Sequence, residues 1–398
     1  MSNNIVKLGE IAALIRGITY KPNDICTKNS DHAVACMRTK NIQSELDKDD
    51  IVWIPKSIIK NPSKFLQPED ILVSSANSWN LVGKACWVPP LTFTASAGGF
   101  ISILRGDTSE VDNRYLFYWF TSNRTQTKLR SFSNKTTNIS NLDHKRTLNL
   151  EIPLPPIEEQ RRIAKILDKK NKIKELINKK SLSLHNLKKS IFLDFFGNPI
   201  TNPKGWEEAP ISNFTSCIVP GRDKPKSFSG NIPWITTDEL LNNFNISNSS
   251  KNIGLTLSEI KEVNAKIIPR NSVLMSCVGN LGTTSISRNE IVINQQLHSY
   301  QCSEDILPEF LTIYLPFRKP WMKAKASQTT LPYLNKANCN AIPIFIPPLE
   351  VQKEFVQALN RILLIDEIIS KINNNIIKLE KSLNNSLFVA IKNDGDIE

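Results

Sequence analysis

The sequence predicts an α+β fold in which two similar globular domains, with mixed or antiparallel sheets, alternate with two long helices. Three observations support this prediction: a repeated motif, a heptad pattern after each copy, and short β-like runs before each copy. The motif LPPIEEQ at residues 154–160 returns as IPPLEVQ at 346–352. A period of about 200 residues is far longer than the roughly 20–50 residues of a solenoid repeat. We therefore expect two copies of one module, giving a single chain the pseudo-twofold symmetry of a dimer.

The globular segments before the two motifs have the same layout. Each is expected to begin with a short helix, over residues 8–15 and 211–218, because apolar residues recur there at helical spacing. Runs typical of strands follow at 51–54, 71–74 and 100–104, then at 234–236, 272–275 and 291–293. An aromatic helix closes each segment, at 114–120 and 309–315. The predicted domains are 1–151 and 198–341, with helical segments at 152–197 and 342–398.

After each motif, apolar residues continue at alternating 3- and 4-residue spacing for about five heptads, which is typical of a coiled coil. Pro156 and Pro348 stand just before the helix starts, and Gly197-Asn198-Pro199 stops the first helix. Two such helices most simply pair with each other, and an antiparallel pair would form a rigid spacer. The expected seam residues are Ile163, Ile166, Ile173, Ile177, Leu184, Leu187, Ile191, Phe355, Ile362, Ile365, Ile369, Ile372, Ile376, Leu379 and Leu383.

The composition favours a nucleic-acid partner. The formal net charge is +12, and such an excess of positive charge attracts polyanions, although ordinary solubility would explain it too. No run of 18 apolar residues suggests a membrane span, and the first residues lack the apolar stretch of a signal peptide. The seven cysteines include no CxxC pair and the four histidines are scattered. We therefore expect a reduced, cytoplasmic protein without a metal site.

The sequence contains no recognisable catalytic motif. A phosphate-binding P-loop, a GxGxxG fingerprint and a GxSxG elbow are all missing. The Pro-Pro pairs at 89–90, 155–156 and 347–348 lack the Asp or Asn and the aromatic residue that flank them in DNA adenine methyltransferases. Glu259-Ile260-Lys261 resembles the end of a nuclease triplet, but such triplets are common by chance and the first half has no counterpart. We expect a binding protein without catalytic residues.

Candidate DNA contacts lie in polar segments that occur in both halves. Hydroxyl and amide groups can meet phosphates and base edges, while Lys and Arg supply charge. Solvated loops and drift after duplication would produce a similar pattern, so both explanations stay open. The candidates are Arg38, Thr39, Lys40, Asn41, Ser75, Asn77, Lys84, Arg130, Lys135, Thr136, Thr137, Arg222, Lys224, Lys226, Thr236, Thr237, Asn280, Gln295, Gln296, Gln328, Thr329 and Thr330.

Over essentially its whole length, the chain resembles the specificity subunit of Type I restriction–modification systems. The resemblance rests on PPxxxQ at 155–160 and 347–352, each copy following a globular segment and preceding heptads. It implies that each domain is a target recognition domain gripping half of a bipartite site in double-stranded DNA. It also implies that the helices set the half-site spacing and dock two methyltransferase subunits. Those subunits would use S-adenosylmethionine to methylate adenine N6, and two restriction subunits using ATP and Mg²⁺ would join them. No cofactor is expected on this chain.

Two other classes of function stay open. A self-contained DNA methyltransferase or nuclease with an unrecognised motif would be active as the purified chain. A coiled-coil adaptor without a DNA role would show none of the salt-dependent DNA binding that the first interpretation predicts.

Overall fold

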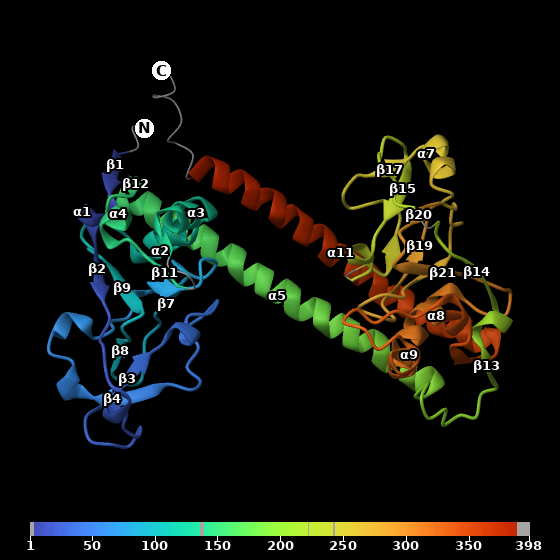
Figure 1. The fold of residues 1–398 in the computed structure, drawn as a ribbon, viewed down its shortest axis with the longest axis horizontal. Coiled ribbons are helices and arrows are strands. Elements are labelled where there is room, and N and C mark those ends of the chain that lie inside the picture. Colours follow the sequence, from blue (N-terminus) through green and yellow to red (C-terminus); the bar gives the residue numbers. More distant parts are fainter. Residues whose placement is uncertain (1–3, 136–138, 222, 242, 388–398) are drawn as a thin grey trace. The chain divides into compact units, whose positions relative to one another are not determined.

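The computed structural model describes residues 4–135, 139–221, 223–241 and 243–387 of the 398. The chain forms two compact units, each with its own core: unit 1 is Met1–Glu175 with Asn374–Glu398, and unit 2 is Leu176–Asn373. Both long helices contribute residues to both units (Figure 1). Within the described part of the chain, no helix is both long and apolar enough to cross a membrane.

Unit 1 is built around an antiparallel sheet with the strand order β2-β9-β5-β7. These strands are β2 (Ala12–Arg16), β9 (Ile101–Gly106), β5 (Ile71–Ser74) and β7 (Ala85–Trp87). A second sheet has the order β4-β3-β8, where β3 (Ala33–Met37) runs antiparallel to β4 (Val52–Pro55) and parallel to β8 (Ala95–Ala97). The pair β1 (Asn4–Lys7) and β12 (Glu151–Leu154) brings the start of the first globular segment to its end. A small sheet joins β10 (Asn134–Lys135), β11 (Ser140–Asn141) and β6 (Ala76–Asn77).

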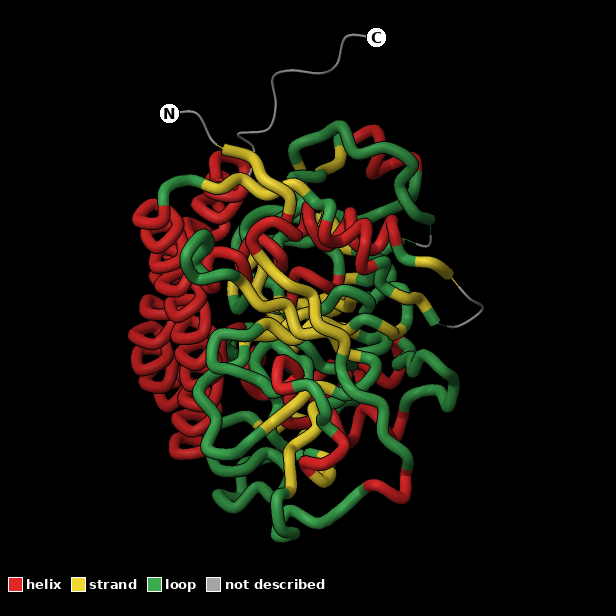
Figure 2. Tube along the Cα trace, turned by 90° about the vertical axis from the view of Figure 1, so that its left-hand side faces the viewer, coloured by secondary structure: helices red, strands yellow, loops and turns green. Residues whose placement is uncertain are grey.

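Short helices and 3₁₀ turns complete unit 1. Loops and turns, green in Figure 2, make up much of the chain between the helices and strands. The aromatic helix α2 packs Tyr115, Trp119 and Phe120 into the core beside the largest sheet. The helices are α1 (Leu8–Ile11), α2 (Asn113–Thr121), α3 (Asn123–Phe132) and α4 (His144–Leu148), and the turns are η1 (Pro22–Asp24), η2 (Thr39–Asn41), η3 (Lys56–Ile58) and η4 (Pro62–Lys64).

Unit 2 repeats this plan. Its main sheet has the order β14-β21-β18-β19-β16, from β14 (Thr215–Ile218), β21 (Leu297–Cys302), β18 (Val273–Ser276), β19 (Thr284–Ser287) and β16 (Asn245–Ile246). Its second sheet has the order β17-β15-β20, where β15 (Ile232–Ile235) runs antiparallel to β17 (Gly254–Leu255) and parallel to β20 (Val292–Ile293). The closing pair is β13 (Glu208–Pro210) with β22 (Pro343–Phe345). The helices and turns are η5 (Ile211–Asn213), α6 (Thr237–Leu240), α7 (Leu257–Glu262), α8 (Pro308–Tyr314), η6 (Leu315–Arg318), α9 (Lys319–Lys325) and α10 (Lys336–Asn340).

The predicted α+β fold with mixed and antiparallel sheets is confirmed, but the helices expected at the start of each segment are wrong. Only Leu8–Ile11 is helical in the first, and the chain then enters β2. In the second, the turn η5 leads directly into β14. The apolar spacing alone could not distinguish helix from strand. Both segments become edge strands because they pair with an interior strand of their main sheet, β9 or β21. Tertiary pairing overrode the local pattern.

The two long helices are α5 (Ile157–Phe196) and α11 (Leu349–Leu387). Within unit 2 they run antiparallel, as predicted. Lys188 of α5 donates to Asp366 of α11 at 2.5 Å, while Phe196, later in α5, packs on Phe355, earlier in α11, with ring centroids 5.1 Å apart. The pairing therefore combines a largely buried ion pair with an aromatic cluster.

The seam on α11 is displaced from the predicted one. Phe355, Ile362 and Ile376 are buried as expected, and Ile369 is half-buried, but Ile365, Ile372 and Leu379 are 48%, 44% and 60% exposed. The less exposed positions between them are instead Leu359, Asp366 and Asn373. Because Asp366 and Asn373 are polar, a prediction based on apolar residues selected the neighbouring isoleucines.

The predicted seam of α5 is also only partly buried. Ile163, Ile177 and Leu184 are buried, and Ile166 and Ile191 are half-buried. Ile173 and Leu187 are 43% and 45% exposed. The side chain of Leu383 lies outside the described residues.

Candidate nucleic-acid interface

In both units, the carboxyl ends of the two parallel strands bring together several of the predicted contact residues. In unit 1, Met37 of β3 pairs with Ala97 of β8, and the chain continues as Arg38-Thr39 on one side and Gly98-Gly99-Phe100 on the other. In unit 2, Ile235 pairs with Ile293, followed by Thr236-Thr237 and Asn294-Gln295-Gln296. Parallel strands end at the same edge of a sheet, and crevices at such ends are common ligand sites.

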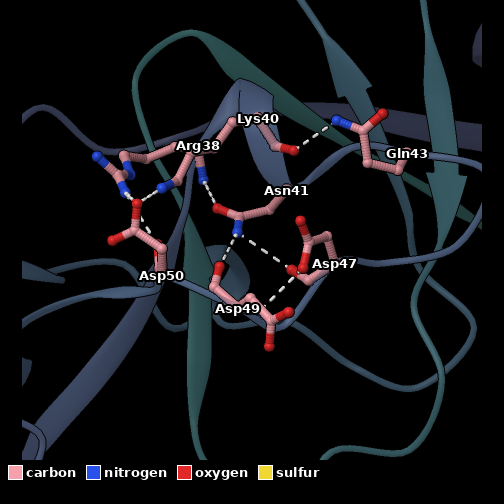
Figure 3. A network of polar contacts seen from close by, with 7 residues as sticks. All are labelled: Arg38, Lys40, Asn41, Gln43, Asp47, Asp49 and Asp50. Atoms are coloured by element: carbon pink, nitrogen blue, oxygen red, sulfur yellow. Dashed lines mark hydrogen bonds and ion pairs between the residues drawn. The ribbon is translucent and has the colours of Figure 1, made fainter. Parts of the chain in front are cut away.

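The loop that follows β3 is organised by Asn41, which is fully buried (Figure 3). Its amide oxygen accepts from the Arg38 backbone N–H at 2.8 Å. Its amide nitrogen donates to the backbone carbonyls of Asp47 and Asp49 at 3.1 and 3.2 Å. These bonds shape the loop and leave Asn41 without exposed surface. The prediction that Asn41 contacts DNA is therefore wrong, because its side chain is not accessible.

The predicted cations of this loop share one carboxylate. Arg38 and Lys40 both form ion pairs with Asp50, whose side chain is 75% exposed (Figure 3). Arg38 also donates to the Asp50 backbone carbonyl at 2.8 Å. Lys84, another candidate, donates to Gln43 at 2.8 Å. Exposed pairs of this kind are weak, so a phosphate could replace Asp50 at little cost.

A second group of candidates lies directly beside the first. The carbonyl of Phe100 accepts from the backbone N–H of Ser75 and of Ala76, at 2.9 and 3.2 Å. Asn77 then pairs with Ser140 of β11, which in turn pairs with Lys135 of β10. The structure thus links the segments around residues 38, 75 and 135 into one surface. Thr136 and Thr137 lie outside the described residues, as does the side chain of Lys135.

Unit 2 shows the same chain of contacts with different side chains. Thr237 donates to the amide oxygen of Gln296 at 3.2 Å, and the Gln296 carbonyl accepts from the Cys277 N–H at 2.9 Å. Val278 then forms a bridge with Tyr333. The exposed residues Gln328, Thr329 and Thr330 lie in the loop just before Tyr333. Here too, three predicted segments form one surface.

The remaining candidates are placed as follows. Asn280 is exposed and accepts from Lys319 at 2.6 Å, and Gln295 donates to the Asp223 carbonyl at 2.9 Å. Lys224 and Lys226 are exposed on the loop before β15. Arg130 is half-buried near the end of α3, and Arg222 lies outside the described residues.

The sequence interpretation missed an apolar groove in unit 1. It holds about 470 Å³ and is lined by the loop after β2, by Arg38 and Thr39, and by Gly98-Gly99-Phe100. Tyr20 is one wall, and burial raises the pKa of its phenol, which therefore stays neutral. The only signal for this groove that the sequence offered was the pair of glycines, Gly98 and Gly99, directly before an aromatic residue.

The family model of the Type I restriction modification DNA specificity domain matches residues 2–186 and again 203–378. The chain belongs to this family. The two matched copies correspond to the two halves with their repeated sheets.

Curated relatives in this DNA specificity family are themselves named as specificity subunits. The StySPI subunit of Salmonella potsdam is 23% identical over 406 residues, covering 95% of this chain and 85% of the relative. The putative MjaX subunit of Methanocaldococcus jannaschii is 24% identical over 334 residues, covering 81% and 78%. The EcoKI subunit of Escherichia coli K12 is 32% identical over 166 residues, covering 41% of this chain and only 35% of that subunit.

The fold of this DNA specificity family is seen in a solved neighbour. The S subunit of the Type I restriction–modification system from M. genitalium superposes with a TM-score of 0.63, covering 100% of this chain and 97% of that one, at 13% identity. That likeness concerns the fold.

The repeated motif PPxxxQ has a clear structural role here. Gln160 is buried, accepts from the Asp112 N–H just before α2 at 2.9 Å, and donates to the Pro155 carbonyl at 2.8 Å. Gln352 is also buried, accepts from the Leu307 N–H just before α8 at 2.9 Å, and donates to the Pro347 carbonyl at 2.9 Å. Each glutamine therefore ties the closing aromatic helix of its globular segment to the start of a long helix.

Proposed function

We propose that the chain reads a bipartite DNA site for a Type I restriction–modification complex, each unit recognising one half. Residues 1–151 and 198–341 would be the two target recognition domains. The observation that carries the proposal is the repeated surface at the parallel strand ends. Its backbone contacts are the same in both units, while its side chains are arginine, glycine and phenylalanine in one and threonine and glutamine in the other. Such a framework reads two different sequences without requiring a palindrome.

The segments 152–197 and 342–398, which contain the long helices, would set the distance between the half-sites. α5 and α11 have 40 and 39 residues. At about 1.5 Å per residue each is roughly 60 Å long, enough to span half-sites one turn of B-DNA, about 34–36 Å, apart.

The helices also offer a docking surface for partner subunits. On α11, Leu364, Ile365, Ile368 and Ile372 are 61%, 48%, 50% and 44% exposed. Their spacing places them along one side of the helix, next to the seam that faces α5. An exposed apolar stripe of this kind is typical of a protein–protein contact. We assign it to helices of the methyltransferase subunits.

Catalysis would belong to those partners. The methyltransferase subunits would bind S-adenosylmethionine and methylate adenine N6, and the restriction subunits would use ATP and Mg²⁺. The specificity chain would position both on the DNA.

Methylome sequencing tests the reading role. Cells with the intact system should carry one bipartite methylated motif that disappears when this chain is deleted. Replacing Gln296 with Leu should relax or change one half of the motif and leave the other half intact, since a good bidentate contact discriminates by about 1–3 kcal/mol. A motif that survives deletion, or a change in both halves, would contradict the proposal.

Co-purification tests the docking surface. The double substitution Ile365→Asp and Ile368→Asp should abolish recovery of the methyltransferase subunit with the tagged chain. The matched control is Leu257→Asp in α7, because Leu257 is 69% exposed and lies away from α11 in the sequence. Equal recovery from both variants would show that the stripe serves another purpose.

A further inference from the structure

The apolar groove of unit 1 is preformed by its backbone. Ile18 forms a parallel bridge with Gly98, and its N–H donates to the Ala97 carbonyl at 2.8 Å. A Cβ on Gly98 would stand 3.2 Å from the Met37 carbonyl oxygen, and one on Gly99 would stand 3.3 Å from the Thr19 hydroxyl. The two glycines therefore let the loop after β2 lie close against the strand ends, with Tyr20 beside them.

The groove exposes apolar surface that the fold does not use. Phe100 is 65% exposed and Ile25 is 51% exposed, and both line it. The backbone of Phe100 is nevertheless held by Ser75 and Ala76, so the ring projects from a fixed position. A fixed, exposed aromatic ring in a groove favours a flat apolar ligand.

One wall of the groove carries a cation, Arg38. The Nε atom of Arg38 is buried and has no hydrogen-bond partner among the described residues, although the Nη2 atom of the same side chain is held by Asp50. The exposed part of this side chain, which is 35% accessible, lines the groove and supplies positive charge to a ligand held there.

The equivalent place in unit 2 lacks these features. Gln295 and Gln296 stand where unit 1 has Gly99 and Phe100, and both are bonded, to the Asp223 carbonyl and to Thr237. No counterpart of the groove's glycines and projecting ring stands at these positions. The glycines and the projecting ring therefore distinguish unit 1 from unit 2 at these positions and provide an internal comparison.

We propose that unit 1 holds one unstacked nucleobase of its half-site in this groove, against Phe100 and Tyr20, with the exposed part of the Arg38 side chain beside the edge of the base. The inference rests on the proposed DNA-reading function and deepens it. A nucleobase is flat, carries acceptors on its edge and has a π-face that stacks on aromatic rings. The groove volume of about 470 Å³ is far larger than a thymine methyl group needs and lies within the range of ligand pockets.

The test uses the assembled complex with methyltransferase subunits and duplexes that carry the methylated motif. 2-Aminopurine, whose fluorescence rises when it leaves the base stack, replaces each base of both half-sites in turn. We expect one position in a single half-site, other than the methylated adenine, to brighten with the wild-type complex and stay dark with Phe100→Ala. The methylated adenine should brighten with both, because its extrusion serves the partner's chemistry.

Affinity provides the second readout. Phe100→Ala should weaken binding roughly 5- to 150-fold, equivalent to the about 1–3 kcal/mol of base–aromatic stacking. Phe100→Leu should fall in between. Leu81→Ala is the matched control, since Leu81 is 43% exposed in the same unit but does not line the groove. Because Phe100 is exposed, thermal unfolding of these variants should match that of the wild type.

The outcomes separate this inference from the broader function. A complex that binds its motif without any Phe100-dependent bright position overturns the base-binding groove and leaves the reading function standing. A loss of methyltransferase co-purification in Phe100→Ala would identify a protein ligand and also overturn it. A complex that binds no DNA at all would overturn the proposed function itself.

Discussion

The two units use one backbone plan with opposite arrangements of charge at the same strand ends. In unit 1 the cations Arg38 and Lys40 follow the central strand, and the acid Asp50 comes from the next loop. In unit 2 the acid Asp238 follows the central strand, and the cation Lys251 comes from the next loop, 3.0 Å away. The backbone framework is retained, while the acidic and basic partners exchange places. Under the proposed function, the two surfaces would therefore present different charges to DNA. A duplicated backbone can thus keep its contacts while its surface charges change.

The largest expected effect on stability comes from removing the buried glutamine that both units share. Replacing Gln352 with Leu should destabilise unit 2 by about 2–4 kcal/mol, because the half-buried Leu307 N–H and the buried Pro347 carbonyl would lose their partner. Hydrogen exchange should show faster opening of β21, with β9 of unit 1 unchanged. Gln160→Leu is the mirror control and should affect β9. Equal effects of either variant on both strands would show that the two glutamines do not act on separate units.

A pH effect should distinguish the units next. Burial lowers the pKa of His298, on β21, to about 4, so this imidazole is neutral in the folded protein at pH 7. In the unfolded chain the pKa of this histidine is about 6.5, so protonation below that pH favours the unfolded state. The free energy of unfolding therefore keeps its full value above about pH 6.5 and decreases as the pH falls toward 4, by up to about 3 kcal/mol in total. Hydrogen exchange at pH 7 and pH 5, corrected for intrinsic rates, should show this loss in β21. His298→Asn should reduce the difference between the exchange rates of β21 at pH 7 and pH 5. An unchanged pH dependence in the variant would assign it to other groups.

The smallest expected effect concerns DNA affinity and comes from removing the acidic partner of each ion pair, Asp50 or Asp238. Asp50→Asn would release Arg38 and Lys40, so DNA binding should tighten and its logarithmic salt dependence steepen by about one phosphate contact. Asp238→Asn is the corresponding change in unit 2 and would release Lys251. Titrations at several salt concentrations measure both slopes. If neither slope changes, these cations do not reach phosphates in the complex.

Much of the candidate surface could be predicted because the duplication marks it. The segments around Thr39, Ser75 and Lys135 each have a counterpart, and the structure joins them through the Phe100 carbonyl and the pairing of Asn77. Burial could not be predicted. Asn41 looks like a polar contact residue, yet its amide is used by the backbone of its own loop. Phe100 looks like a core residue, yet its ring is exposed.

The sequence by itself determined the two-module plan, the two long helices and the family. These depend on local periodicity and on a motif that occurs twice, and both are visible in the order of residues. Only the tertiary structure decided that residues 12–16 and 215–218 are strands, that the α11 seam passes through Asp366 and Asn373, and that the strand ends form one surface. Those features depend on partners distant in sequence. A residue's own spacing and polarity do not say which neighbours will cover it.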